Sequence, residues 1–456
     1  MTSRTLLPWL LAAFLAACGS PTPAGPAAPA PAASSAPPAA SVPDPPASAE
    51  LSAPVAVASA SAAPAAPETP EVRRPMNVLL LVIDAMRSDM PWNGYTRPIA
   101  PNLTKLYERS VRYPHHYSIS SFTSKSVPSI LSGRYPSELH RTTPFFTVYG
   151  QNNEMMAEVL QRAGVRTLAA QAHAYLDRPS GLTQGFDVWR LVPGITFDYN
   201  KDPYITSQKH TPLAIDILSE PKNVTPRFFA YFHYMDPHDV YQPHEESPKY
   251  GRKSRDLYDE EMFYTDLWIQ KLLDWVDTQP WAKETAIIVT ADHGEAFGEH
   301  KIWRHAFELY DVLVHVPLFF VIPGAQPREV PAWRSQIDLV PTIYDLMGVA
   351  APEGLPGKSL VPEILGKDEP ARPIICDLPA DTHNERRRAF IEDGWKLIAF
   401  GNDFRYEMYN LLEDPGETRN LFKKDKAKAE AMRARYKQVS ATLREVKARG
   451  GDPVKN

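Results

Sequence analysis

The sequence is poor in cysteine, because its 456 residues include only Cys18 and Cys376. It also lacks a large excess of either charge, with 49 Lys and Arg residues against 54 Asp and Glu residues. Balanced charge does not indicate a basic groove, so we expect no nucleic-acid partner. The N-terminus has no long apolar run, since the stretch from Leu6 to Ala17 is too short to span a bilayer.

The first twenty residues have the pattern of an export signal. One Arg precedes the short apolar run, and the tetrapeptide LAAC at 15–18 closely resembles the lipobox of bacterial lipoproteins. The resemblance implies a signal peptide over residues 1–18 and lipid modification of Cys18, which would anchor the exported protein to the cell envelope. Gly19, rather than Asp, favours the outer membrane if the cell is Gram-negative. The alternative is a buried apolar helix with an incidental cysteine.

Residues 19–75 consist almost entirely of Ala, Pro and Ser. Such a segment buries too little apolar surface to offset the entropy of ordering, so we predict a disordered tether. In a fully extended polyproline conformation it would reach on the order of 170 Å. We therefore expect membrane contact through the lipid anchor alone. Lipidation of Cys18 would leave Cys376 as the only thiol and exclude an intrachain disulfide.

The composition becomes that of a globular protein from Met76 onward. Short apolar runs, typical of strands buried on both faces of a parallel sheet, alternate with helix-like segments. The predicted strands are 77–83, 228–232, 286–289 and 316–322, and the predicted helices are 152–163, 256–277 and 337–347. This alternation predicts an α/β fold with a doubly wound sheet and helices on both faces.

A different pattern begins after about residue 365, which divides a catalytic domain over 76–365 from a C-terminal subdomain over 366–456. Short strand-like pieces at 389–392, 395–400 and 405–409 are separated by turns. The final segment, 423–449, is rich in Lys, Ala, Glu and Arg and predicts a solvated amphipathic helix. The C-terminal part is therefore expected to be a small α+β subdomain.

Acidic and imidazole side chains follow two of the predicted strands. Asp84 ends the first strand, and Asp292 and His293 follow the 286–289 strand. Active residues of open parallel sheets gather beyond the carboxyl ends of the strands, so these three groups could converge on one divalent cation. An isolated Asp after a strand more often caps a helix, and an isolated His more often packs in the core. The Asp-His pair favours the metal site.

The segment ISSFTSKSVPSILSGRYP at 119–136 is rich in hydroxyl side chains and leads into an apolar segment. A hydroxyl at a helix N-terminus lies where backbone N–H groups and the helix dipole favour an anion, including an alkoxide. A metal ion at the same point would activate that hydroxyl further. The segment is therefore a candidate for the nucleophile.

Several ordered segments together resemble the sulfatases, a family within the alkaline phosphatase superfamily. They lie at 77–89 (NVLLLVIDAMRSD), 181–187, 290–300 (TADHGEAFGEH), 309–318, 336–342, 395–397, 409–411, 414–418 and 420–421. The resemblance covers nearly all of the chain from residue 76 to about 422. It implies the alkaline phosphatase-like fold and a metal-dependent enzyme that acts on sulfo- or phospho-esters.

The resemblance also indicates the nucleophile. Family members carry Cys or Ser, followed by x-Pro-x-Arg, ten residues before the Gly that corresponds to Gly133, and this position is Thr123 here. Val127 stands where the Arg would be, so we expect no formylglycine. An unmodified Thr resembles the nucleophile of phosphoglycerol and phosphoethanolamine transferases and of some phosphodiesterases. Ser126 begins Ser-Val-Pro-Ser, but its spacing to Gly133 is three residues short, and Ser124 is the alternative if the count is off by one.

The metal ligands differ from the usual sulfatase pattern at two positions. Sulfatases commonly have two adjacent Asp after the first strand and Asp-Asn at the second site, with Ca²⁺ between them. Ala85 and His293 replace one Asp and the Asn. Imidazole in place of an oxygen ligand favours Mn²⁺ or Zn²⁺, with Ca²⁺ as the alternative. We therefore predict one divalent ion held by Asp84, Thr123, Asp292 and His293.

Two further histidines are predicted to be catalytic. His238 best matches the substrate-binding His of the family, and His305 lies near the position of a family Lys, where it could protonate the leaving oxygen. The role of His173 stays open, because the Lys and Trp that precede the corresponding family His are absent. For three others the interpretation is an ordinary surface or loop residue: His115, His116 and His244.

The sequence thus predicts a surface-anchored, metal-dependent hydrolase of the sulfatase family, or a phosphotransferase, with Thr123 as nucleophile. A phosphoester is favoured over a sulfate ester, as part of a small molecule or of an envelope glycan or lipid. Two alternatives remain. One is a true sulfatase with a degenerate maturation motif, and the other is a catalytically inactive lipoprotein that uses the fold for binding.

Overall fold

The computed structural model describes residues 74–197 and 204–450. The predicted signal peptide, Cys18 and nearly all of the predicted tether lie outside these residues. At the centre of the described part is an eight-stranded sheet with the order β11-β2-β10-β7-β1-β6-β4-β5. Strand β1 (Asn77–Ile83) matches the predicted bounds and lies between β7 (Thr285–Ala291) and β6 (Phe228–Tyr234), parallel to both.

The pairing register brings the carboxyl ends of the three central strands to one level. Ile83 pairs with Ala291 of β7 and with Tyr234 of β6. Because side chains that follow paired residues lie side by side, the residues after β1 and β7 share one edge of the sheet. Beyond β6, the parallel strands β4 (Arg166–Gln171) and β5 (Val188–Leu191) complete this half.

The other half of the sheet is mixed. Strand β10 (Leu318–Val321) falls in the predicted 316–322 segment but runs antiparallel to β7, followed by β2 (Val111–Arg112) and β11 (Arg328–Glu329). The connection from β7 contains no long crossover helix, and Thr290 Oγ1 donates a hydrogen bond to the carbonyl of Pro317 at 2.8 Å. The chain therefore turns back beside β7, which requires the antiparallel direction.

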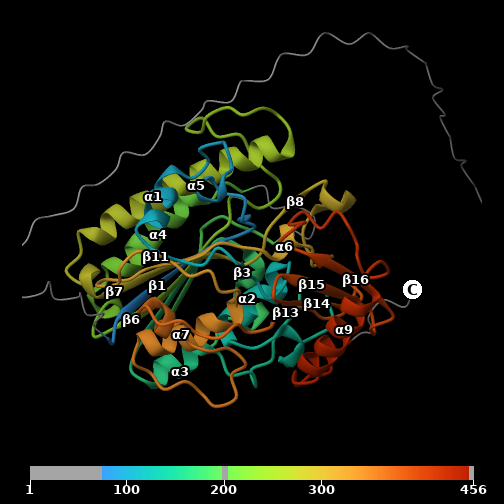
Figure 1. Ribbon diagram of the computed structural model, residues 1–456. Coiled ribbons are helices and arrows are strands. Elements are labelled where there is room, and N and C mark those ends of the chain that lie inside the picture. Colours follow the sequence, from blue (N-terminus) through green and yellow to red (C-terminus); the bar gives the residue numbers. More distant parts are fainter. Residues whose placement is uncertain (1–73, 198–203, 451–456) are drawn as a thin grey trace, which may run out of the picture. The chain divides into compact units, whose positions relative to one another are not determined.

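Helices cover both faces of the sheet (Figure 1). Helices α2 (Thr123–Ser132), α3 (Met156–Arg162) and α7 (Leu339–Leu346) contribute to one core, and α1 (Pro101–Glu108), α4 (Ser207–Ser219) and α5 (Ser254–Asp277) to the other. Strand β1 supplies both cores, because alternate side chains point to opposite faces. Val78, Leu80 and Val82 enter one core, and Leu79, Leu81 and Ile83 enter the other. This arrangement confirms the predicted doubly wound α/β fold.

The C-terminal part contains an antiparallel four-stranded sheet (Figure 1). Its strands are β13 (Ile374–Leu378), β14 (Arg387–Glu392), β15 (Trp395–Phe400) and β16 (Arg405–Asn410). Helix α9 (Lys426–Ser440) packs on this sheet through Ala429, Met432 and Tyr436, which recur at helical spacing.

The predicted helix over 423–449 was too long at both ends. The Asp425 side chain accepts a hydrogen bond from the Lys428 amide and caps the helix start. After Ser440 the chain leaves the helix and runs back to the catalytic domain, where the amide of Val446 donates to the carbonyl of Ser137. Charged composition alone could not show that these last residues bond to a distant loop.

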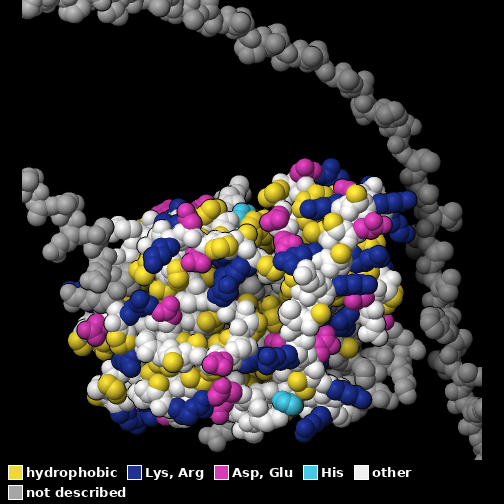
Figure 2. All heavy atoms as spheres, turned by 60° about the horizontal axis from the view of Figure 1, so that its bottom comes forward, with side chains coloured by type: hydrophobic (Ala, Val, Ile, Leu, Met, Phe, Trp, Pro, Cys, Tyr) yellow, Lys and Arg dark blue, Asp and Glu magenta, His cyan; other side chains and the backbone are white. Residues whose placement is uncertain are grey.

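The remaining elements are short. They are β3 (His116–Tyr117), β8 (Ala296–Phe297), β9 (Trp303–Arg304), β12 (Arg334–Ser335), α6 (Asp311–Val314) and α8 (Val361–Ile364). Within residues 74–197 and 204–450, no helix combines the length and apolar character needed to cross a bilayer. Figure 2 shows Lys and Arg side chains interspersed with Asp and Glu over one face of the molecule.

Candidate active site

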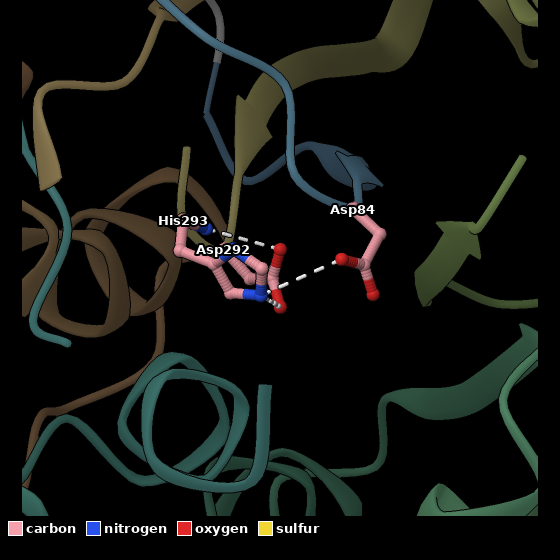
Figure 3. Close-up of side chains that lie close together, drawn as sticks. All are labelled: Asp84, Asp292 and His293. Atoms are coloured by element: carbon pink, nitrogen blue, oxygen red, sulfur yellow. Dashed lines mark hydrogen bonds and ion pairs between the residues drawn. The ribbon is translucent and has the colours of Figure 1, made fainter. Parts of the chain in front are cut away.

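Three of the four predicted metal ligands come from the aligned strand ends. Asp84 follows β1 directly, and Asp292 and His293 follow β7. Thr123 is the first residue of α2, which lies beneath the same edge. Asp84, Asp292 and His293 are fully buried, and each offers a ligand atom within 4.8 Å of the others (Figure 3). The structure thus brings together side chains that are far apart in the sequence.

The distances among these groups are those of a small cation site. Thr123 Oγ1 lies 3.0 Å from His293 Nε2 and 3.4 Å from Asp84 Oδ2. His293 Nε2 lies 3.5 Å from Asp84 Oδ1 and 3.5 Å from Asp292 Oδ2 (Figure 3). Four ligands at bonds of about 2.1 Å in a tetrahedron are about 3.4 Å apart. The donor set therefore fits one divalent ion.

A buried carboxylate oxygen supports the same interpretation. Asp84 Oδ1 has no hydrogen-bond partner among the described residues, although Asp84 is completely buried. An unsatisfied buried anion is costly, and a bound cation would satisfy it. Burial alone would raise the pKa of Asp84, but the neighbouring imidazoles of His233, His238 and His293 hold this pKa well below its usual range. Asp84 is therefore ionised and ready to bind a cation.

The tautomer of His293 follows from its own contacts. His293 Nδ1 lies 2.9 Å from the carbonyl oxygen of Gly294, to which only a protonated Nδ1 can donate. In the neutral ring this leaves the lone pair on Nε2, directed at Thr123, Asp84 and Asp292. Nε2 can therefore serve as a metal ligand.

Thr123 is presented by an unusual helix start. The preceding residue, Phe122, is extended, with φ −153° and ψ 131°, and its carbonyl accepts the amides of Lys125 and Ser126. Pro128 lies inside α2 and has no N–H to donate to the Ser124 carbonyl, so that carbonyl accepts the Tyr149 hydroxyl instead, at 2.7 Å. The helix continues through the proline, and its N-terminus, where negative charge is favoured, stays at the metal ligands.

The other two candidate hydroxyls lie differently. Ser126 Oγ donates to the Phe122 carbonyl at 3.0 Å and lies 3.5 Å from Asp292 Oδ2. Ser124 Oγ donates to the carbonyl of Phe145 at 2.8 Å. Of the three, Thr123 makes the shortest contact with the predicted ligands, and it remains the predicted nucleophile.

Ala85 lies in the turn after β1 and contacts Asp292, which follows β7. Its φ is 55°, in the left-handed region that is costly for residues other than glycine. Its amide lies 3.4 Å from Asp292 Oδ1, and its carbonyl accepts the Tyr258 hydroxyl at 2.9 Å. Ala85 stands where the sulfatase pattern described above has a second Asp. Here the backbone amide of Ala85, and not a side chain, contacts Asp292.

His233 and Glu295 belong to the site but were not predicted. His233 lies on β6, and its Nε2 is 3.4 Å from Asp84 Oδ2. Burial opposes protonation of His233, yet the neighbouring carboxylates of Asp84 and Asp292 outweigh it and raise the pKa of His233. The sequence signal was present, since His233 is in the same segment as His238 and comes just before the end of an apolar strand.

Glu295 orients one of the two predicted catalytic histidines. His305 Nδ1 lies 3.2 and 3.3 Å from the two carboxylate oxygens of Glu295. Burial opposes ionisation of Glu295, but the His305 charge lowers the pKa of Glu295 below its ordinary value. The His305 ring is centred 4.3 Å from the His293 ring and 4.9 Å from the His238 ring. His305 thus lies beside the predicted metal ligand His293, and His238 lies beside His305.

Among the other histidines, His173 is centred 5.9 Å from His238, and burial lowers the pKa of His173 to about 3, so it is neutral at pH 7. Four more contact other parts of the protein: His300 packs on Tyr310, His115 on Trp333, His244 on Tyr264, and His116 lies against the carbonyl of Val316.

A comparison with protein families decides the classification. The family model for Sulfatase matches residues 76–349, which is more than half of the chain. The chain belongs to the sulfatase family. A second model, described as N-sulphoglucosamine sulphohydrolase, C-terminal, matches residues 298–446 of this sulfatase-family protein.

Curated relatives are distant but extensive. The sulfatase-family chain is 24% identical over 427 residues to a choline-sulfatase of Rhizobium meliloti, covering 76% of this chain and 82% of the relative. It is 25% identical over 344 residues to an ulvan-active sulfatase of Formosa agariphila, covering 65% and 66% of the two chains. These relatives support ester hydrolysis as the general activity.

Solved structures show the same fold. An enzyme in complex with its substrate D-glucosamine-2-N,6-O-disulfate superposes with a TM-score of 0.68 at 19% identity, covering 81% of this sulfatase-family chain and 98% of that one. A phosphonate monoester hydrolase from Silicibacter pomeroyi superposes with a TM-score of 0.66 at 20% identity, covering 81% and 96%. The fold is therefore shared with hydrolases of both sulfur and phosphorus esters.

Proposed function

We propose that this protein is a metal-dependent ester hydrolase in which Thr123 is the nucleophile and a phosphoester is the favoured substrate. The observation that carries this proposal is the position of Thr123 Oγ1, 3.0 Å from His293 Nε2 and 3.4 Å from Asp84 Oδ2. A divalent ion at these ligands would lower the pKa of the hydroxyl and neutralise charge on the ester oxygens.

The residues support a two-step displacement. Thr123 Oγ releases its proton to solvent and attacks phosphorus or sulfur, while the bond to the leaving oxygen breaks. His305, oriented by Glu295, gives its proton to the departing oxygen. In the second step a water molecule gives a proton to His305 and attacks phosphorus or sulfur. The bond to Oγ then breaks, the inorganic anion is released, and Oγ takes up a proton from solvent.

The preference for phosphorus follows from the chemistry of release. A formylglycine hydrate can expel sulfate by collapsing to its aldehyde, whereas a Thr ester has no such path. The Thr ester must be cleaved by attack on the transferred group, which is more plausible at phosphorus than at sulfur. Val127 and Ile130 occupy the positions where the formylglycine motif needs Arg. An unmodified Thr123 therefore favours a phosphoester.

A variant panel tests the proposal. Purified wild type and Thr123→Ala are assayed with aryl phosphate, phosphodiester and aryl sulfate in Mn²⁺, Zn²⁺ or Ca²⁺. We expect phosphoester turnover in the wild type and a loss of at least about 10³-fold in the variant. Ser129→Ala is the matched control and should retain most activity, because Ser129 Oγ donates to the Lys125 carbonyl within α2 at 3.2 Å. Undiminished turnover in Thr123→Ala would exclude Thr123 as the nucleophile.

The two alternatives give different outcomes. A true sulfatase would hydrolyse the sulfate ester, and intact mass spectrometry of the 119–136 peptide would show a modified Ser or Thr. An inactive binding protein would contain no metal after purification, which elemental analysis would reveal.

We further propose that the enzyme is exported and anchored to the cell envelope through lipidated Cys18, and that its substrate is a small molecule or an envelope ester. The LAAC sequence at 15–18 supports this proposal. Replacement of Cys18 by Ala should release the protein from the membrane fraction on fractionation. Retention of the variant in that fraction would contradict lipid anchoring.

A further inference from the structure

Phenylalanines from separate segments meet beside the predicted nucleophile. We call this group the aromatic wall and define it as Phe122, Phe145, Phe146, Phe197 and Phe307. Phe122 stacks on Phe145 with ring centroids 4.1 Å apart and meets Phe146 edge-on at 5.7 Å. Phe307 stacks on Phe145 at 6.0 Å, and Phe197 meets Phe146 edge-on at 4.9 Å. These separations are within the favourable range for aromatic pairs.

The aromatic wall continues directly into the candidate active site. Phe122 precedes Thr123, and its ring lies 6.3 Å from the ring of His305. The amide of Ala306 donates to the carbonyl of Ser121 at 2.8 Å, which holds the segment around His305 beside the start of α2. The wall is therefore on the side of the site where His305 would protonate the leaving oxygen.

The aromatic wall leads from the buried site to solvent. Phe122 is 4% exposed, whereas Phe307 is 49% exposed. Burying the exposed surface of the Phe307 ring against a flat apolar group would be favourable by about 25 cal/mol per Å². Phe307 thus offers surface that a bound substrate could cover.

Phe145 is held in place by its backbone from two directions. Its carbonyl accepts hydrogen bonds from Ser124 Oγ at 2.8 Å and from the buried Lys125 Nζ at 3.2 Å. Its amide donates to Thr382 Oγ1, in the C-terminal subdomain, at 3.0 Å. A ring ordered in advance loses little entropy when a ligand binds, which is typical of a recognition surface rather than an incidental loop.

Two cationic side chains near the wall are paired within the protein. Arg304, which precedes His305, forms an ion pair with Asp239 at 3.0 Å. Lys125, whose Nζ lies 5.8 Å from the centre of the Phe122 ring, forms an ion pair with Asp381 at 3.3 Å.

We propose that the aromatic wall is the leaving-group subsite and that the substrate carries an aromatic or similarly flat apolar group next to its ester. This inference rests on the proposed function, because the leaving group must depart on the side of His305. Phe307 is its specificity-determining residue and stacks on the group as the ester oxygen approaches His305, while Phe145 holds the Phe307 ring in place.

The test is a binding measurement that needs no turnover. Phenylphosphonate and methylphosphonate share one head group and differ only in the ring, and each is titrated calorimetrically into Mn²⁺-loaded protein. The same comparison with benzenesulfonate and methanesulfonate covers a sulfur head group. We expect the aryl ligand of at least one pair to bind about ten-fold more tightly than its methyl partner, from the stacking and burial of one ring.

Two exposed phenylalanines provide a matched pair of variants. Phe307→Ala should weaken the binding of the aryl ligand about five-fold and leave the affinity for the methyl ligand unchanged, because an aromatic pair contributes binding energy on this scale. Phe404→Ala, at a ring that is 71% exposed in the C-terminal subdomain, should change neither ligand. Both rings are exposed enough that their loss should not prevent folding.

Several results would overturn the inference. The first is equal affinity of the wild type for the aryl and methyl ligands. The second is that Phe307→Ala weakens the binding of both ligands equally. The third is that the wild type binds none of the four ligands. Failure of the proposed function looks different. In that case the wild type would still bind the aryl ligand more tightly than the methyl ligand, but it would hydrolyse none of the esters.

Discussion

Thr123 Oγ1 and His293 Nε2 lie 3.0 Å apart, although 170 positions separate the two residues in the sequence. Both atoms also lie within 3.5 Å of a carboxylate oxygen of Asp84. One divalent ion bound among these groups accounts for the contacts and for the unsatisfied Asp84 Oδ1. The first prediction concerns this ion.

Removal of the metal should abolish activity reversibly. After treatment with a chelator, hydrolysis is expected to return with Mn²⁺ or Zn²⁺ more fully than with Ca²⁺, because His293 replaces an oxygen ligand. His293→Ala should reduce the bound metal measured by elemental analysis. His300→Ala is the control, since His300 stacks on Tyr310 outside the site. Full activity after exhaustive chelation would contradict a metal-dependent reaction.

Loss of His305 should matter most for poor leaving groups. We expect His305→Ala to lower kcat by about 10²-fold or more for an alkyl phosphoester, which needs a proton on its leaving oxygen. The loss should be much smaller for 4-nitrophenyl phosphate, whose leaving oxygen needs no proton. Steady-state kinetics over a series of leaving groups measures the difference. An equal loss across the series would show that His305 does not act as the acid.

The effects of the buried Lys125 and Asp381 charges on the free energy of unfolding should depend strongly on each other. Lys125 Nζ lies 3.3 Å from the Asp381 carboxylate, and both side chains are 1% exposed. Burial lowers the pKa of Lys125 to about 8, against the opposing charge of Asp381. Lys125→Met leaves a buried carboxylate without its cation and should lower the free energy of unfolding by about 3–5 kcal/mol.

The double variant provides the control for that pair. Asp381→Asn keeps an acceptor for the amides of His383 and Asn384, which the Asp381 carboxylate binds at 2.8 and 2.9 Å. Combined with Lys125→Met, it should recover about 1–3 kcal/mol relative to Lys125→Met alone. Urea denaturation of the four proteins measures the coupling. Strictly additive losses would show that the two charges do not interact.

Asp338 should make stability depend on pH. Burial raises the pKa of Asp338 to about 6, despite the ion pair with Arg372. Between about pH 4 and 6 the unfolded state has already lost this proton while the folded state retains it. The folded state then binds more protons, so stability falls as pH rises. The stability that the protonated Asp338 carboxyl contributes is fully present below about pH 4 and is lost above about pH 6.

The measurement compares wild type with Asp338→Asn, which cannot titrate at this position. The wild-type free energy of unfolding should fall relative to the variant by up to about 3 kcal/mol between pH 3.5 and 7. Chemical denaturation at several pH values would show the change. A constant difference across this range would show that Asp338 has an ordinary pKa in the folded protein.

The sequence by itself determined much of the frame. Apolar runs such as 77–83 predicted the buried central strands, because only a strand covered on both faces is apolar at every position. Asp84, Asp292 and His293 could be predicted together, because the carboxyl ends of neighbouring parallel strands meet at one edge. The family spacing from Gly133 identified Thr123 among several nearby hydroxyls.

Tertiary contacts decided the rest. His233 contacts Asp84, and Glu295 contacts His305, only because β6 lies beside β1 and the chain after β7 folds back on itself. The end of α9 and the antiparallel direction of β10 likewise depend on bonds between segments distant in the sequence. A periodic pattern records which face of an element is buried, but not which partner covers it. The aromatic wall is the clearest case, since Phe122, Phe307 and the Phe145–Phe146 pair share no motif and meet only in the folded chain.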